Sequence, residues 1–174
     1  MNLPNALTIL RFLLVPVFMV FMLLNELPYA NIICAAIFVL AFFTDWLDGF
    51  LARKNNQVTN FGKIMDPLAD KVLVTAALVC LNVSSVVSAW VTVIILAREF
   101  IVSGIRISAA SEGNVIAASM WGKAKTMWQF IALTLAILIG KNLYIDICIW
   151  LAAALTIVSG IDYLMKNGKY LSLK

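Results

Sequence analysis

Four aspartates lie at helical spacing in two neighbouring segments of an otherwise apolar chain. Asp45 and Asp48 are three residues apart in the stretch TDWLDGFLAR, and Asp66 and Asp70 are four residues apart in FGKIMDPLADK. Spacings of three and four residues put side chains on one face of a helix. Each segment therefore predicts a pair of carboxylates on one helix face.

Four carboxylates that lie close together repel one another unless cations neutralise them. Two divalent ions carry the charge that balances four carboxylates, and ligands that are all oxygen favour hard ions such as Mg²⁺ or Mn²⁺. The chain has no histidine, and its three cysteines show no metal-ligand spacing. The residues thus favour a site for two divalent metal ions, Mg²⁺ or Mn²⁺, formed by Asp45, Asp48, Asp66 and Asp70.

Asp66 and the residues that follow Asp48 also have simpler structural explanations when each is taken singly. Asp66 precedes Pro67, which fits a helix N-cap followed by proline at the first helical position. Arg53 fits a basic residue flanking a membrane span, and Gly49 and Ala52 fit close helix packing. None of these explanations accounts for all four aspartates together.

The composition indicates an integral membrane protein. Of the 174 residues, 63% are hydrophobic and 13% are charged, whereas soluble domains are roughly 45–50% apolar and about 25% charged. A spanning helix needs about 20 apolar residues. Hydropathy predicts six of them, at residues 6–24, 30–52, 64–82, 86–107, 119–140 and 143–165. We therefore expect an all-α membrane bundle of six transmembrane helices with a short N-terminal cytoplasmic segment, forming a single domain over residues 1–174.

The distribution of Lys and Arg predicts how the bundle is oriented. If the N-terminus is cytoplasmic, 12 of the 13 basic residues fall on the inner side, and only Lys141 falls outside. Cytoplasmic segments are enriched in Lys and Arg. The sequence therefore predicts a multi-pass protein of the cell membrane with both termini, and the aspartates, at the cytoplasmic face.

The spacing of the acidic segments forms a longer pattern. Residues 45 to 70 read D-x-x-D-G-x-x-A-R, then eight residues, then G-x-x-x-D-x-x-x-D. This pattern resembles the signature of the CDP-alcohol phosphatidyltransferase family, with every position filled. The resemblance implies a six-helix membrane bundle, usually a homodimer, in which the four aspartates hold two divalent metal ions and Asp70 is the general base. It further implies that CDP-diacylglycerol is bound by Asp48, Gly49, Ala52, Arg53 and Gly62, with Arg53 at the diphosphate.

The chemistry of such a transfer agrees with the residues present. Moving a phosphatidyl group from CDP-diacylglycerol displaces CMP at the lipid-linked phosphorus, and metal ions polarise a phosphoryl group. A base must remove the proton of the acceptor hydroxyl. Because the chain has no histidine, a carboxylate is the natural candidate for that base.

A second polar group is predicted at the same membrane face. Its residues come from the stretches NALTILR, AREFIVSGIR and WGKAKT, and they are Thr8, Arg11, Arg98, Arg106, Lys123 and Lys125. Singly, each cation fits snorkelling, an ion pair or a flanking position. Together, these cations are more numerous than the orientation of the helices in the membrane requires. The planar guanidinium of arginine can donate two hydrogen bonds to a phosphate dianion. We therefore expect an anion pocket for a phosphorylated acceptor.

The acceptor is suggested by a weaker resemblance. The stretches LPNALTILR, LAREFIVSGIR and WGKAKT resemble the branch of the family in which glycerol 3-phosphate is the acceptor and phosphatidylglycerophosphate is the product. The likeness runs from about residue 3 to residue 130, and the last span carries little information. The sequence thus predicts a metal-dependent enzyme of phospholipid biosynthesis, with membrane lipid as its surroundings and no nucleic-acid partner.

Two alternatives remain open at this stage. The first is a synthase of the same family with another acceptor, such as inositol phosphate or serine. The second is a cation-coupled transporter, because carboxylates inside a membrane also mark ion pathways. The clustering of the acidic residues at one face, and the absence of charge from the outer halves of the third to fifth spans, argue against a transporter.

Overall fold

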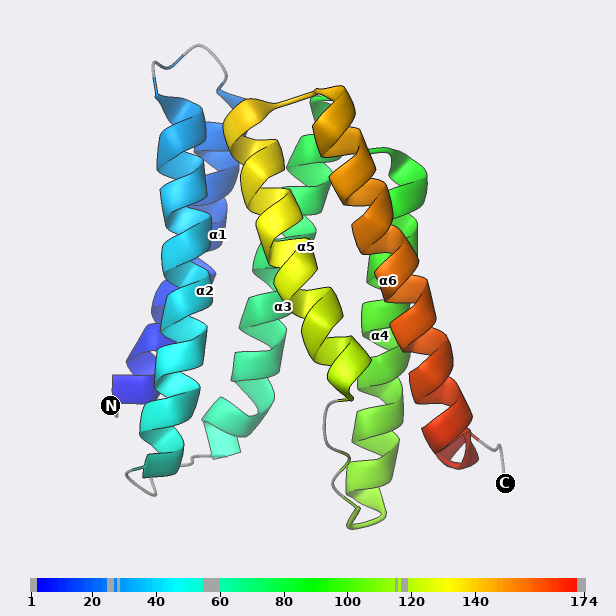
Figure 1. Ribbon diagram of the computed structural model, residues 1–174. Helices are drawn as coiled ribbons and strands as arrows, with labels where there is room; N and C mark the ends of the chain where they lie inside the picture. The colour runs from blue at the N-terminus through cyan, green and yellow to red at the C-terminus, as the bar shows by residue number, and fades with distance from the viewer. Residues whose placement is uncertain are drawn as a thin grey trace. The chain divides into compact units, whose positions relative to one another are not determined.

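The computed structural model is all-helical in the part of the chain that it describes (Figure 1). That part comprises residues 3–24, 27, 29–54, 60–114, 116 and 119–171, without the side chains of residues 3–5, 45–54, 60–64, 66, 67, 70, 169 and 171. The elements in chain order are α1 (Leu3–Leu23), α2 (Ala30–Lys54), α3 (Asn60–Val83), α4 (Ala89–Ser111), α5 (Met120–Ile139), α6 (Leu143–Asn167) and the 3₁₀-helix η1 (Gly168–Leu171).

The helices confirm the all-α prediction and nearly coincide with the predicted spans. The largest differences lie where polar residues continue a helix beyond its apolar part: α3 begins at Asn60, and α4 ends at Ser111. Because α3 begins at Asn60, Asp66 lies inside the helix. The explanation of Asp66 as an N-cap is therefore wrong.

The chain divides into two compact units. Unit 1 consists of Met1–Ser84 with Ile137–Ile139, and unit 2 consists of Ser85–Ala136 with Gly140–Lys174. Unit 1 thus holds the acidic motif, and unit 2 holds α4, most of α5, α6 and η1.

In unit 1, α1 packs against both α2 and α3. The ring centroids of Phe18 and Phe38 are 6.3 Å apart, and both side chains are buried. The Cys34 thiol donates a hydrogen bond to the carbonyl oxygen of Phe18 (3.7 Å). Figure 1 shows that α1 begins at the end of this unit where α2 ends and α3 begins. The segments that carry the acidic motif and the polar residues of α1 therefore belong to the same end of unit 1.

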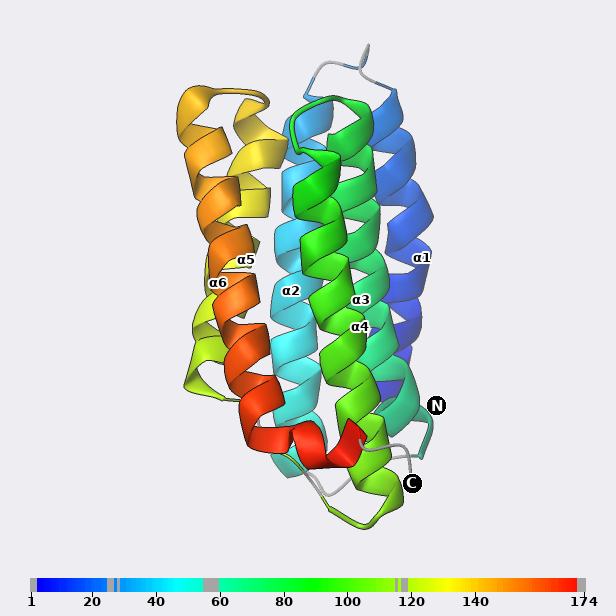
Figure 2. The same cartoon turned by 90° about the vertical axis from the view of Figure 1, so that its right-hand side faces the viewer.

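In unit 2, α4 packs against α6 and against η1, which turns back toward α4 after α6 (Figure 2). The Ser108 hydroxyl of α4 donates a hydrogen bond to the carbonyl oxygen of Tyr170 in η1 (3.0 Å), which holds η1 against α4. Between α5 and α6, Gly140 has φ 76° and ψ −155°. A side chain is strained in that conformation, so glycine ends α5 at this position.

The described side chains form an apolar core that includes a few polar residues, and many large apolar side chains lie outside it. Thr8, Arg11, Lys125 and Gln129 are among the buried polar residues, whereas large apolar side chains on every helix are exposed. Leu13, for example, is 62% exposed. Polar groups on the inside and apolar groups on the outside suit a lipid environment.

Two helices of the described chain are long and apolar enough to cross a membrane, at Ala6–Leu23 and Leu143–Asn167. Shorter apolar stretches occupy Ala30–Thr44 and Lys71–Val83, which are the parts of α2 and α3 next to the residues whose side chains are not described. The predicted number of six crossings stays a prediction.

Replacing Phe18 by Ala should lower the free energy of unfolding by about 2–4 kcal/mol, because the ring is fully buried between helices of unit 1. Equilibrium unfolding in mixed detergent micelles measures the change. Leu13→Ala, in the same helix but 62% exposed, is the matched control and should have a much smaller effect. Equal losses for the two variants would contradict the packing described for unit 1.

Candidate functional site

The acidic motif lies on two continuous helices of unit 1. Asp45, Asp48, Gly49, Ala52 and Arg53 fall within α2, which runs to Lys54. Gly62, Asp66 and Asp70 fall within α3, each four residues after the one before. The helical register that the sequence predicted for both segments is therefore present. The side chains of all eight motif residues lie outside the described part of the structure.

Metal binding by this motif stays a prediction. Among the side chains that are described, no group of three or more His, Cys, Asp or Glu residues could hold a metal ion. The motif carboxylates are outside that set. The argument for a divalent ion therefore comes from the residue types and from the helical spacing. The four carboxylates belong to two helices that contact each other, and they supply only oxygen ligands.

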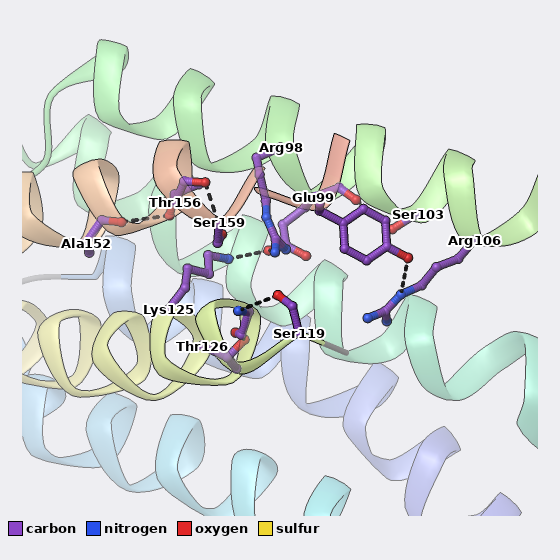
Figure 3. Close-up of polar contacts among 12 residues, drawn as sticks. Arg98, Glu99, Ser103, Arg106, Ser119, Lys125, Thr126, Ala152, Thr156 and Ser159 are labelled. Atoms are coloured by element: carbon purple, nitrogen blue, oxygen red, sulfur yellow. Dashed lines mark hydrogen bonds and ion pairs between the residues drawn. The ribbon is translucent and has the colours of Figure 1, made fainter. Parts of the chain in front are cut away.

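The described polar cluster lies in unit 2 and is centred on Glu99 (Figure 3). The Lys125 ammonium of α5 donates to Glu99 Oε1, and Arg98 Nη1 lies 3.3 Å from the same oxygen. Lys125 is only 2% exposed, and the side chains of Arg98 and Glu99 are 12% and 22% exposed. Among these three described side chains, two are cations and one is a carboxylate. The cluster therefore remains suited to an anion.

The start of α5 is fixed close to this cluster. Ser119 is the N-cap of α5, and its hydroxyl accepts a hydrogen bond from the backbone N–H of Gly122 (3.1 Å). A Cβ built at Gly122 would lie 3.5 Å from Arg98 Nη2. This is an ordinary van der Waals distance, so the Arg98 guanidinium lies against the first turn of α5, and Lys125 follows one turn later.

Helix α6 supplies a second close approach to Arg98. A Cβ built at Gly160 would lie 3.1 Å from Arg98 Cγ, which is closer than most side chains tolerate. Glycine at position 160 therefore makes room for the aliphatic part of Arg98. The hydroxyl of the neighbouring Ser159 is buried and donates to the carbonyl oxygen of Thr156 (3.1 Å).

Arg106 contacts α6 instead of Glu99. Its Nε donates a hydrogen bond to the Tyr163 hydroxyl oxygen (3.3 Å), and its Cζ lies 5.7 Å from the centre of the Tyr163 ring. Tyr163 is 2% exposed, whereas Arg106 is exposed. Figure 3 shows the side chains of Arg98 and Arg106 extending from the same side of α4.

The remaining predicted acceptor residues are placed differently. Thr8 and Arg11 are buried in α1 of unit 1, and Lys123 is exposed in the first turn of α5. Within unit 2 the structure brings Arg98 and Lys125 together through Glu99. The assignment of all six residues to acceptor binding stays a prediction.

Sequence reasoning missed the contribution of α6. Tyr163 and Gly160 lie in the span that was judged uninformative, yet they contact Arg106 and Arg98. Their spacing of three residues places them on one face of α6. A tyrosine and a glycine in an apolar helix are common for packing reasons alone, so this spacing gave little signal without knowledge of the partner helix.

The chain matches the CDP-alcohol phosphatidyltransferase family over residues 1–158, and it belongs to that family. It is 43% identical to the CDP-diacylglycerol–glycerol-3-phosphate 3-phosphatidyltransferase of Bacillus subtilis, with 95% of each chain covered. Proteins of the same name from Rickettsia bellii and Haemophilus influenzae are each 42% identical. The matches cover 97% of both chains for the first, and 94% of this chain and 91% of the relative for the second.

Replacing Glu99 by Gln should lower the free energy of unfolding by about 1–3 kcal/mol, because Lys125 is then buried without its carboxylate. Equilibrium unfolding in mixed micelles measures the loss. The double variant Glu99→Gln, Lys125→Met should recover part of it, since the buried charge is removed as well. A stable single variant, or a double variant that is no better than the single one, would contradict the role of Glu99 as counter-charge.

Proposed function

We propose that this protein transfers the phosphatidyl group of CDP-diacylglycerol to glycerol 3-phosphate, giving phosphatidylglycerophosphate and CMP. The observation that carries the proposal is the 43% identity, over 95% of both chains, to a relative named for this reaction. The complete acidic motif in α2 and α3 and the two cations around Glu99 support it.

The donor would be bound in unit 1. The carboxylates of Asp45, Asp48, Asp66 and Asp70 would hold two divalent ions, Mg²⁺ or Mn²⁺. When bound, these ions supply a polarised phosphoryl group and neutralise charge on its oxygens. The residues expected to bind the CDP-diacylglycerol are Asp48, Gly49, Ala52, Arg53 and Gly62. The small residues among them leave space for the nucleotide against the α2 backbone.

The acceptor would be held by cations and activated by a carboxylate. Asp70 removes the proton of the primary hydroxyl of glycerol 3-phosphate. The resulting oxygen attacks the lipid-linked phosphorus, the bond from that phosphorus to CMP breaks, and CMP leaves. The residues proposed to bind the acceptor phosphate are Thr8, Arg11, Arg98, Arg106, Lys123 and Lys125. Of these, Arg106 is accessible to a soluble ligand and offers a planar fork of donors.

The setting of the reaction is also a proposal. The protein would be a homodimer of single-domain chains that cross the cell membrane several times, with the site at the cytoplasmic face. The bias of Lys and Arg toward one side supports this orientation. The two long apolar helices and the exposed apolar side chains support a membrane location.

Purified protein in detergent should release CMP from CDP-diacylglycerol with glycerol 3-phosphate and Mg²⁺ or Mn²⁺, and EDTA should abolish the release. Inositol 1-phosphate and serine, tested in parallel, should give little or none. Release with one of these in place of glycerol 3-phosphate would overturn the acceptor assignment. An absence of release under every condition would contradict phosphatidyl transfer.

Replacing Asp70 by Asn should lower kcat by at least about 100-fold, because the amide can neither accept the hydroxyl proton nor fully replace a metal-binding carboxylate. The melting temperature in detergent should change little, since the two side chains have nearly the same shape. Asp162→Asn, an acid-to-amide change in α6 of unit 2, is the control and should keep most of the activity. An Asp70→Asn variant with substantial turnover would remove Asp70 from catalysis.

A further inference from the structure

The contact between Arg106 and Tyr163 joins an exposed cation to a buried anchor. Tyr163 is 2% exposed and belongs to a hydrophobic cluster with Val102 and Ile105. Its hydroxyl oxygen accepts the hydrogen bond from Arg106 Nε, and its ring lies beneath the guanidinium at 5.7 Å. Because Tyr163 is buried and Arg106 is exposed, the tyrosine is the fixed partner that holds the guanidinium.

The geometry of this contact leaves a particular part of the guanidinium for a ligand. An arginine has five N–H donors in one plane, and the hydrogen bond to Tyr163 occupies the donor on Nε. The two Nη groups carry the other four donors. A phosphate that meets this arginine is therefore directed to the Nη edge, where two parallel hydrogen bonds are possible.

The position of Arg106 on α4 relates it to the cluster around Glu99. It follows Arg98 by eight residues, a little more than two helical turns. The two arginine side chains extend from the same side of α4 (Figure 3). Two residues on one face of α6 contact them: Gly160 gives room to Arg98, and Tyr163 holds Arg106.

We infer that Tyr163 is a positioning residue for the acceptor phosphate, acting through the guanidinium of Arg106. This inference rests on the proposed function, in which the acceptor carries a phosphate. The hydroxyl of Tyr163 holds the arginine in a binding orientation before the acceptor arrives, so that less side-chain freedom is lost on binding. The last helix thereby contributes to acceptor affinity without contributing a charged group.

The variant Tyr163→Phe tests this role because it keeps the buried ring and removes only the hydroxyl. It should raise the KM for glycerol 3-phosphate roughly 3- to 10-fold, with kcat and the KM for CDP-diacylglycerol changed less than about twofold. Tyr144→Phe, which removes the same group from a 75% exposed tyrosine at the other end of α6, is the matched control and should leave all three values unchanged.

A double-mutant cycle separates positioning from general support of the fold. Arg106→Ala alone should raise the KM for glycerol 3-phosphate more than the KM for CDP-diacylglycerol. In the Arg106→Ala background, Tyr163→Phe should add less than about twofold, because the hydroxyl then has no arginine to hold. Independent effects of the two substitutions, or an equal effect of Tyr163→Phe on both substrates, would overturn the inference.

Ligand-induced stabilisation gives a readout that does not depend on turnover. Glycerol 3-phosphate should raise the melting temperature of the wild-type protein, and Tyr163→Phe should reduce that rise while the ligand-free melting temperature stays close to the wild-type value. If the wild type uses another phosphorylated alcohol, the acceptor proposal fails and the cycle is run with that alcohol. If the wild type releases no CMP at all, the rise in melting temperature produced by inorganic phosphate is compared instead. A rise in Tyr163→Phe as large as that in the wild type overturns the inference.

Discussion

Buried cations in an apolar helical unit need a negative partner, and in unit 2 Glu99 provides it for both Arg98 and Lys125. Leaving a charge unpaired away from water is costly, and an apolar surrounding strengthens the attraction between opposite charges. The Glu99 carboxylate therefore fixes how α4 and α5 meet. The close approach of Arg98 to Gly122 belongs to the same meeting of helices.

The same balance of charge gives the cluster its chemistry. Among its three described side chains, one carboxylate is shared by two cations, which suits the cluster to an anion.

The two units carry opposite charge in their polar segments. In unit 1 the four motif aspartates need cations, which fits divalent metal ions and the diphosphate of a nucleotide-linked lipid. In unit 2 the arginines and Lys125 need anions, which fits the phosphate of an acceptor. Helix α6 adds Gly160, which makes room for Arg98, and Tyr163, which accepts a hydrogen bond from Arg106.

The sequence by itself determined the helices, the family and the acidic motif. Apolar runs located each helix, although polar residues extend α3 and α4 beyond them. Residues 45 to 70 form a pattern with fixed gaps within two helices, so local spacing carries that information. Local spacing misjudged Asp66 as a possible N-cap, because a proline inside the start of a longer helix looks the same as one at its first turn.

Only the tertiary structure decided which side chains the cations contact. The sequence groups Lys125 and Arg106 as basic residues for an anion but does not show their protein contacts. Lys125 is buried against Glu99, 26 residues away, and Arg106 Nε donates to Tyr163, 57 residues away. Such contacts depend on the packing of α4 against α6 and on the side chains that reach between α4 and α5. Helical periodicity fixes the face that a residue occupies but says nothing of the helix that covers that face.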